Sequence, residues 1–112
     1  MAEIASMDRI AHFSGLVERQ PTNELFRFSL AQALLGASRD GEAEVHLRQC
    51  VAAKADWMIP RILLGKLLLR AGRATEARPL LAEALQLAVS QNHEAPEAEL
   101  RTLLAELGPA VA

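Results

Sequence analysis

The amino-acid sequence predicts an all-α fold, and three observations support this. The 112 residues suffice for one domain with a buried core, but not for two domains with a cleft between them. Hydrophobic residues make up 51% of the chain, aromatic residues only 4%, and tyrosine is absent. Leucine and alanine must therefore form the core, and these residues favour helix over sheet. The third observation is an internal repeat with helical spacing.

The repeat becomes visible when the chain is shifted by 34 positions against itself. Between residues 28–55 and 62–89, chance would produce roughly two or three identities. The comparison contains eight, and a period of this length is typical of stacked helical hairpins. The identical pairs are Leu30 and Leu64, Leu34 and Leu68, Leu35 and Leu69, Ala37 and Ala71, Arg39 and Arg73, Glu42 and Glu76, Ala43 and Ala77, and Leu47 and Leu81.

The residues at this spacing resemble the tetratricopeptide repeat (TPR) family. In residues 58–91, Leu64, Gly65 and Leu68 are similar to the signature of the family's first helix. Gly65 stands where the resemblance implies a close approach of two helices, and Gly72 stands at the turn between them. This segment is the better copy of the repeat.

The preceding copy, residues 24–57, departs from the family pattern at two positions. Ala31 replaces the packing glycine and Ser38 replaces the turn glycine, so we expect Gly41 to take over the turn. The resemblance implies a right-handed superhelical stack of antiparallel hairpins. It is moderately specific for fold and nearly silent on function.

We predict one TPR-like domain over residues 1–112 with about six helices. An amphipathic segment at 5–21 is expected to cover the first hairpin, and a segment at 94–108 to cap the stack. The helices are expected near residues 5–19, 23–37, 41–54, 57–71, 75–91 and 96–107.

The resemblance implies a protein-interaction scaffold that binds a peptide or a helix of a partner protein. In such stacks the first helix of each hairpin lines a concave groove. The alternative is a structural module that forms a homodimer through the same apolar face. Helical spacing selects the candidate peptide-binding residues Leu25, Phe28, Gln32, Ile59, Ile62, Lys66, Leu69 and Arg70.

Charge is unevenly distributed along the chain. Residues 54–78 carry six basic side chains against two acidic ones, whereas residues 79–112 carry one against five. A partner carboxylate would suit Lys66 and Arg70. The alternative, which we favour, is that the acidic C-terminal segment forms ion pairs with the basic band at residues 54–78 within the chain, or that the basic band is simply solvated. The family's chaperone-tail clamp is not expected, because its positions hold Phe28, Gln32 and Leu63.

Several functional classes are not expected. A net charge of −2 offers no general attraction to nucleic acid, and no segment predicts a membrane anchor or signal peptide. The single Cys50 requires no oxidising compartment, so a cytoplasmic location is predicted. His12, His46 and His93 lack metal-site or dyad spacing. We therefore expect no enzyme, catalytic residue, metal or cofactor.

Overall fold

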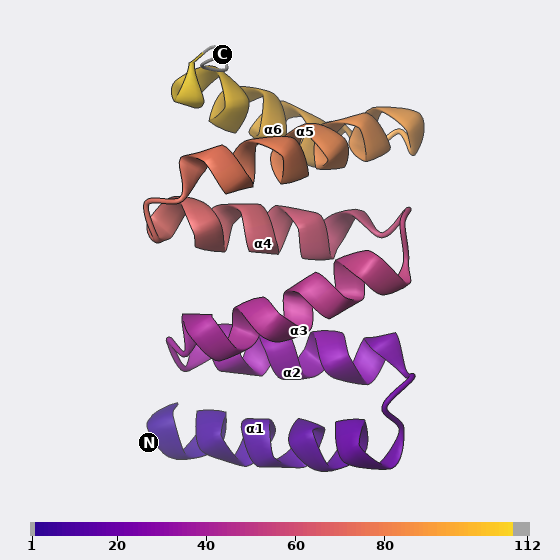
Figure 1. Cartoon of the computed structure of the whole chain (residues 1–112), viewed down its shortest axis with the longest axis vertical. Helices are drawn as coiled ribbons and strands as arrows, with labels where there is room; N and C mark the ends of the chain where they lie inside the picture. The colour runs from indigo at the N-terminus through magenta and orange to yellow at the C-terminus, as the bar shows by residue number, and fades with distance from the viewer. Residues whose placement is uncertain (1, 109–112) are drawn as a thin grey trace. The chain divides into compact units, whose positions relative to one another are not determined.

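A computed structural model describes the backbone of residues 2–108 and the side chains of residues 7–108. This part of the chain forms six α-helices and no strand. Figure 1 labels the helices from α1 to α6. The predicted all-α class is confirmed, and the helix ends agree with the expected ones to within three residues. The helices are α1 (Ala2–Arg19), α2 (Glu24–Gly36), α3 (Asp40–Ala53), α4 (Met58–Arg70), α5 (Ala74–Ser90) and α6 (Glu94–Leu107).

The chain divides into two compact units, one ending at Ala55 and the other beginning at Asp56. In the first unit α1 packs on α2 and α2 on α3; in the second, α4 packs on α5 and α5 on α6. Lys54 ends α3 in an extended conformation, which stops the helix just before the division. The sequence predicted a single domain, and the division lies within two residues of the predicted boundary between residues 24–57 and 58–91.

Leucine and alanine form the core of the first unit. The helices α2 and α3 pack on each other. Each of these buried side chains is at most 4% exposed: Leu30, Ala31 and Leu34 on α2, and Ala43 and Leu47 on α3. The buried positions follow the helical period, so the hydrophobic stripe expected from sequence is the one the hairpin buries.

The second unit repeats this core with a closer helix contact. Leu64 and Leu68 on α4 and Leu81 on α5 are at most 1% exposed. A Cβ atom placed on Gly65 would lie 2.5 Å from Leu81 Cδ2 and 2.7 Å from Leu81 Cγ. Glycine therefore allows α4 to approach α5, as the sequence predicted for this position.

The turns inside the two hairpins share one backbone geometry. Ser38 between α2 and α3 has φ 60°, and Gly72 between α4 and α5 has φ 76°. After each of them an arginine N–H closes the turn on a leucine carbonyl, from Arg39 to Leu34 at 2.9 Å and from Arg73 to Leu68 at 2.8 Å. The expectation that Gly41 replaces the turn glycine is wrong.

Gly41 is the second residue of α3, and Ser38 itself adopts the left-handed conformation. Such a conformation is unfavourable for a residue with a Cβ atom. The hairpin geometry therefore imposes backbone strain on Ser38 that Gly72 does not carry.

Candidate binding sites

The predicted binding residues of the first unit all lie on α2. Leu25 is 66% exposed, Gln32 is exposed and Phe28 is half-buried. Leu25 follows a well-formed helix start, because the Asn23 side chain accepts hydrogen bonds from Leu25 N at 3.1 Å and Phe26 N at 3.3 Å. The exposed leucine is thus held on the first turn of a capped helix.

The second unit presents its predicted residues on α4, with one departure. Ile59 is 39% exposed, Arg70 is exposed, and Lys66 and Leu69 are half-buried. Ile62 is only 6% exposed and belongs to the core, although the sequence placed it on the binding face. The reason is that α4 buries residues around most of its circumference, whereas helical spacing predicts a single buried stripe.

Leu25 and Ile59 occupy the same position in their hairpins. Each is the second residue of its helix, and they are 34 residues apart in the sequence. Both are among the large apolar side chains that the described structure leaves exposed, together with Met7, Val45 and Val89.

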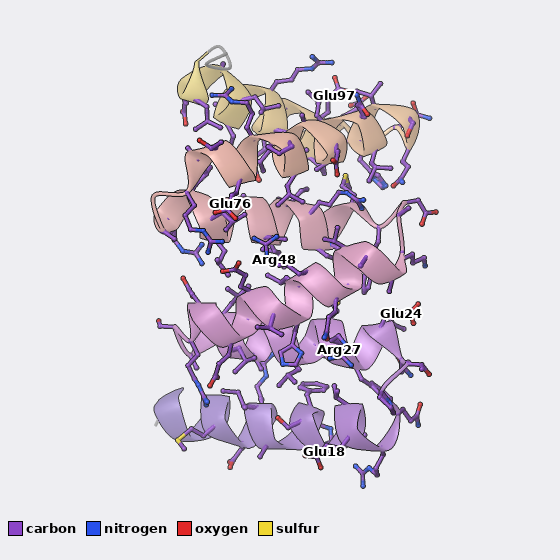
Figure 2. The ribbon with its side chains drawn as sticks, in the orientation of Figure 1. Glu18, Glu24, Arg27, Arg48, Glu76 and Glu97 are labelled. Carbon is purple, nitrogen blue, oxygen red and sulfur yellow. The ribbon has the colours of Figure 1, made fainter. Side chains whose placement is uncertain are left out.

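Intrachain contacts engage much of the basic band at residues 54–78. Lys66 Nζ lies 2.5 Å from Glu99 Oε1, and Arg61 Nε lies 3.1 Å from Glu83 Oε2. Arg78 donates from Nη1 to the Gly108 carbonyl at 2.7 Å, at the C-terminal end of α6, where the helix dipole favours a cation. The acidic C-terminal segment, which contains Glu97 in Figure 2, therefore supplies Lys66 with a partner.

The Lys66–Glu99 ion pair affects how strongly a partner carboxylate could bind at Lys66. The side chains of Lys66 and Glu99 are 37% and 50% exposed, so their attraction contributes at most about 1 kcal/mol. A partner carboxylate at Lys66 would compete with Glu99 at little cost in stability and with little gain in affinity.

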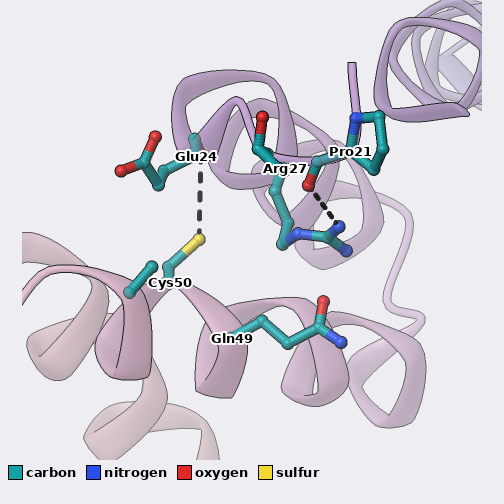
Figure 3. A pocket seen from close by; sticks show the side chains of 7 residues that line it. Pro21, Glu24, Arg27, Gln49 and Cys50 are labelled. Carbon is teal, nitrogen blue, oxygen red and sulfur yellow. Dashed lines mark hydrogen bonds between the residues drawn. The ribbon is translucent and has the colours of Figure 1, made fainter. Parts of the chain in front are cut away.

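The first unit also contains a pocket of about 340 Å³ that sequence reasoning missed. It lies where the segment between α1 and α2 meets the start of α2 and the end of α3 (Figure 3). Its walls come from segments far apart in sequence, so no local pattern could have indicated it. The lining residues are Pro21, Thr22, Glu24, Arg27, Gln49, Cys50 and Ala53.

Among the described residues that line this pocket, Arg27 is the only cation, and neutral acceptors bind it. Its Nη2 donates to the Pro21 carbonyl at 3.0 Å, and its Nη1 lies 3.2 Å from His46 Nδ1. No carboxylate of the described residues forms an ion pair with Arg27. Glu24 and Arg27 both project from α2 (Figure 2), but in the close view their charged ends point away from each other (Figure 3).

Burial, the Arg27 charge and nearby carboxylates set the pKa values of the two titratable groups beside Arg27, with Glu42 acting on His46 and Glu24 on Cys50. Burial, and then the charge of Arg27, lower the pKa of His46 below its ordinary value, which favours the neutral imidazole that can accept from Arg27. Burial raises the pKa of the Cys50 thiol to about 11 despite Arg27. Cys50 is 0% exposed, and its thiol is protonated at neutral pH, so it is a packing residue and not a thiolate nucleophile.

The part of the chain that the structure describes contains neither a metal-binding cluster nor a membrane-spanning helix. No three His, Cys, Asp or Glu side chains there gather into a group able to hold a metal ion. None of the helices there has the length and apolar character needed to cross a membrane. Comparison of the chain with models of protein families, with curated proteins and with solved structures finds no match.

Proposed function

We propose that this chain is a TPR-like interaction module that binds an apolar or amphipathic segment of a partner protein through the exposed faces of α2 and α4. The proposal includes no enzymatic activity and no nucleic-acid or membrane partner. A cytoplasmic location remains a prediction from sequence.

The structural equivalence of the two hairpins supports the TPR-like part of the proposal. Both first helices contain 13 residues, and α2 and α4 begin at positions separated by the period of the sequence repeat. The turns after them place Ser38 and Gly72 in the same left-handed conformation. Equivalent residues Leu30 and Leu64 are both buried, as a repeated packing unit requires.

The observation that carries the binding part is the pair of exposed apolar residues at one repeat position. Leu25 is 66% exposed and Ile59 is 39% exposed. A single exposed apolar side chain is ordinary in a folded protein. Recurrence at the same position of both first helices is what a repeat scaffold that binds through its first helices would show.

The charges of the second unit favour an apolar partner segment over an acidic one. Lys66 already pairs with Glu99, and Arg61 with Glu83. Affinity would therefore come from burying apolar side chains of the partner, for which each fully buried Leu or Ile contributes roughly 1.5–3 kcal/mol.

Site-specific photo-crosslinking tests this function. A benzophenone amino acid at position 25 or 59 should crosslink a defined partner segment, whose synthetic peptide is then titrated into the pure protein by calorimetry. Leu25→Asp and Ile59→Asp should each weaken that binding by about tenfold or more. Val45→Asp and Val89→Asp are matched controls, because both valines are exposed apolar residues outside the proposed face. Equal losses in all four variants would refute the assignment of the face.

The self-associating alternative predicts a different result. Light scattering over a concentration series should show a dimer at micromolar protein that Leu25→Asp or Ile59→Asp dissociates. A monomer at every concentration, with a crosslinked partner of different sequence, would eliminate the homodimer.

A further inference from the structure

We infer that the Arg27 pocket of the first unit is a second binding site, separate from the proposed peptide-binding residues, and that it takes a carboxylate group.

The first argument is the isolated charge of Arg27. Two arginines of the same unit, Arg39 at the start of α3 and Arg48 on α3, form ion pairs with the acidic side chains of Glu42 and Glu44. Arg27 is half-buried, and among the described residues it is bonded only to a carbonyl oxygen and an imidazole nitrogen. A cation whose solvation is reduced and whose charge has no anionic partner attracts an anion more strongly than the exposed, paired arginines do.

The second argument is preorganisation. The Pro21 carbonyl holds one guanidinium nitrogen at 3.0 Å, and His46 Nδ1 lies 3.2 Å from the other. Two contacts from different segments restrict the Arg27 side chain, so ligand binding loses little conformational entropy in ordering that side chain. Two acceptors leave other N–H groups of the guanidinium available, and these suit the planar geometry of a carboxylate.

The third argument is the composition and size of the pocket. Gln49 extends from α3 toward the same space as the Arg27 guanidinium (Figure 3), and its exposed amide can supply a further donor. Pro21, Cys50 and Ala53 offer apolar wall, and about 340 Å³ is at the small end of the range of ligand pockets. Glu24 also lines the pocket, but its carboxylate points away from the Arg27 guanidinium (Figure 3), so the guanidinium and the Gln49 amide can together bind a monoanion with a short apolar group.

Nuclear magnetic resonance tests this site with the full chain and sodium propionate as the probe. Amide shifts are expected for residues 22–27 and 49–53, with a dissociation constant of about 1–10 mM for so small a ligand. Sodium chloride at equal ionic strength should not reproduce them. Absence of these shifts at about 50 mM propionate, or identical shifts with chloride, would overturn the inference.

Variants separate the site from a general charge effect. Arg27→Gln should weaken propionate binding by about tenfold, since it removes a charged donor. Gln49→Leu should weaken it about threefold, and it keeps the contacts of Arg27 with Pro21 and His46 intact if Arg27→Gln fails to fold. Arg48→Gln is the matched control, because it removes one positive charge from the same unit outside the pocket lining, and it should change affinity by less than about twofold. The site would be contradicted if Gln49→Leu bound propionate as tightly as the wild type does. If Arg27→Gln folds, it would also have to bind propionate as tightly as the wild type for the site to be contradicted.

The source of the carboxylate is decided by two more probes, acetyl-alanyl-alanine and its C-terminal amide. If the acid binds more tightly than propionate and the amide does not bind, the site recognises a peptide C-terminus. Equal affinity for the acid and propionate indicates a small free acid. Binding of the amide as tightly as the acid would show that no carboxylate is recognised.

Discussion

Replacing Gly65 with alanine should destabilise the unit that begins at Asp56. The added Cβ atom would lie 2.5 Å from Leu81 Cδ2 and 2.7 Å from Leu81 Cγ, both inside normal contact distance. Leu81 is 0% exposed, so its side chain cannot move away without displacing core neighbours. Overpacking of this kind costs about 1–3 kcal/mol, and the better helix propensity of alanine recovers about 1 kcal/mol. The net loss should be about 1 kcal/mol.

Gly15→Ala is the matched control for this substitution. Gly15 is also inside a helix, but its added Cβ atom would have only Arg19 Nη2 nearby, at an ordinary 3.8 Å. That variant should gain about 0.5–1 kcal/mol from helix propensity alone. Urea unfolding followed by far-UV circular dichroism measures both variants, and the fluorescence of Trp57, the single tryptophan, reports on the unit that contains Gly65.

A double-mutant cycle identifies the clash as the cause. Leu81→Ala removes the colliding atoms, so its cost should be smaller in the Gly65→Ala background than in the wild type. The reasoning is refuted if Gly65→Ala stabilises the chain as Gly15→Ala does, or if the two substitutions at Gly65 and Leu81 are additive.

Four further predictions follow from buried or strained groups. Ser38→Gly should raise the free energy of unfolding by about 0.5–1 kcal/mol in urea titrations, because glycine adopts φ 60° without strain. Cys50 should react with an aromatic disulfide reagent only as urea unfolds the chain, since its pKa is raised to about 11; rapid labelling without urea would contradict this. Stability should fall as pH drops below about 6.5, because the unfolded chain protonates His46 before the folded one, and His46→Gln should reduce this slope. Glu99→Gln should change stability by less than about 1 kcal/mol, and by less still in 1 M salt, because its pair with Lys66 is exposed.

Local chemistry explains why much of the fold could be predicted. Leu30 and Leu34 on α2 are four residues apart, and so are Ala43 and Leu47 on α3. This spacing places each pair on one buried face of its helix, and only the helix period is needed to recognise it. Gly65 could be assigned to a close helix approach because Leu64, Gly65 and Leu68 resemble the signature of the first helix of a tetratricopeptide repeat, and that resemblance implies a close approach at Gly65.

The candidate binding residues were predictable only in part. Leu25 and Ile59 are exposed, as a binding face requires, but Ile62 is buried because α4 is covered on more than one side. The number of neighbours around a helix is a property of the packed unit, and no single helical wheel contains it.

By itself the amino-acid sequence determined the helical class, the helix ends to within three residues, and the buried leucines, because each depends on residues within a few turns of one another. The 34-residue period is visible in the sequence alone. Only the tertiary structure decided that Lys66 pairs with Glu99, that Ile62 lies in the core, and that Arg27 meets Pro21 and His46 beside a pocket. These contacts depend on the side chains and angles at which separate helices meet. That geometry results from packing the whole unit, so residue order alone does not show it.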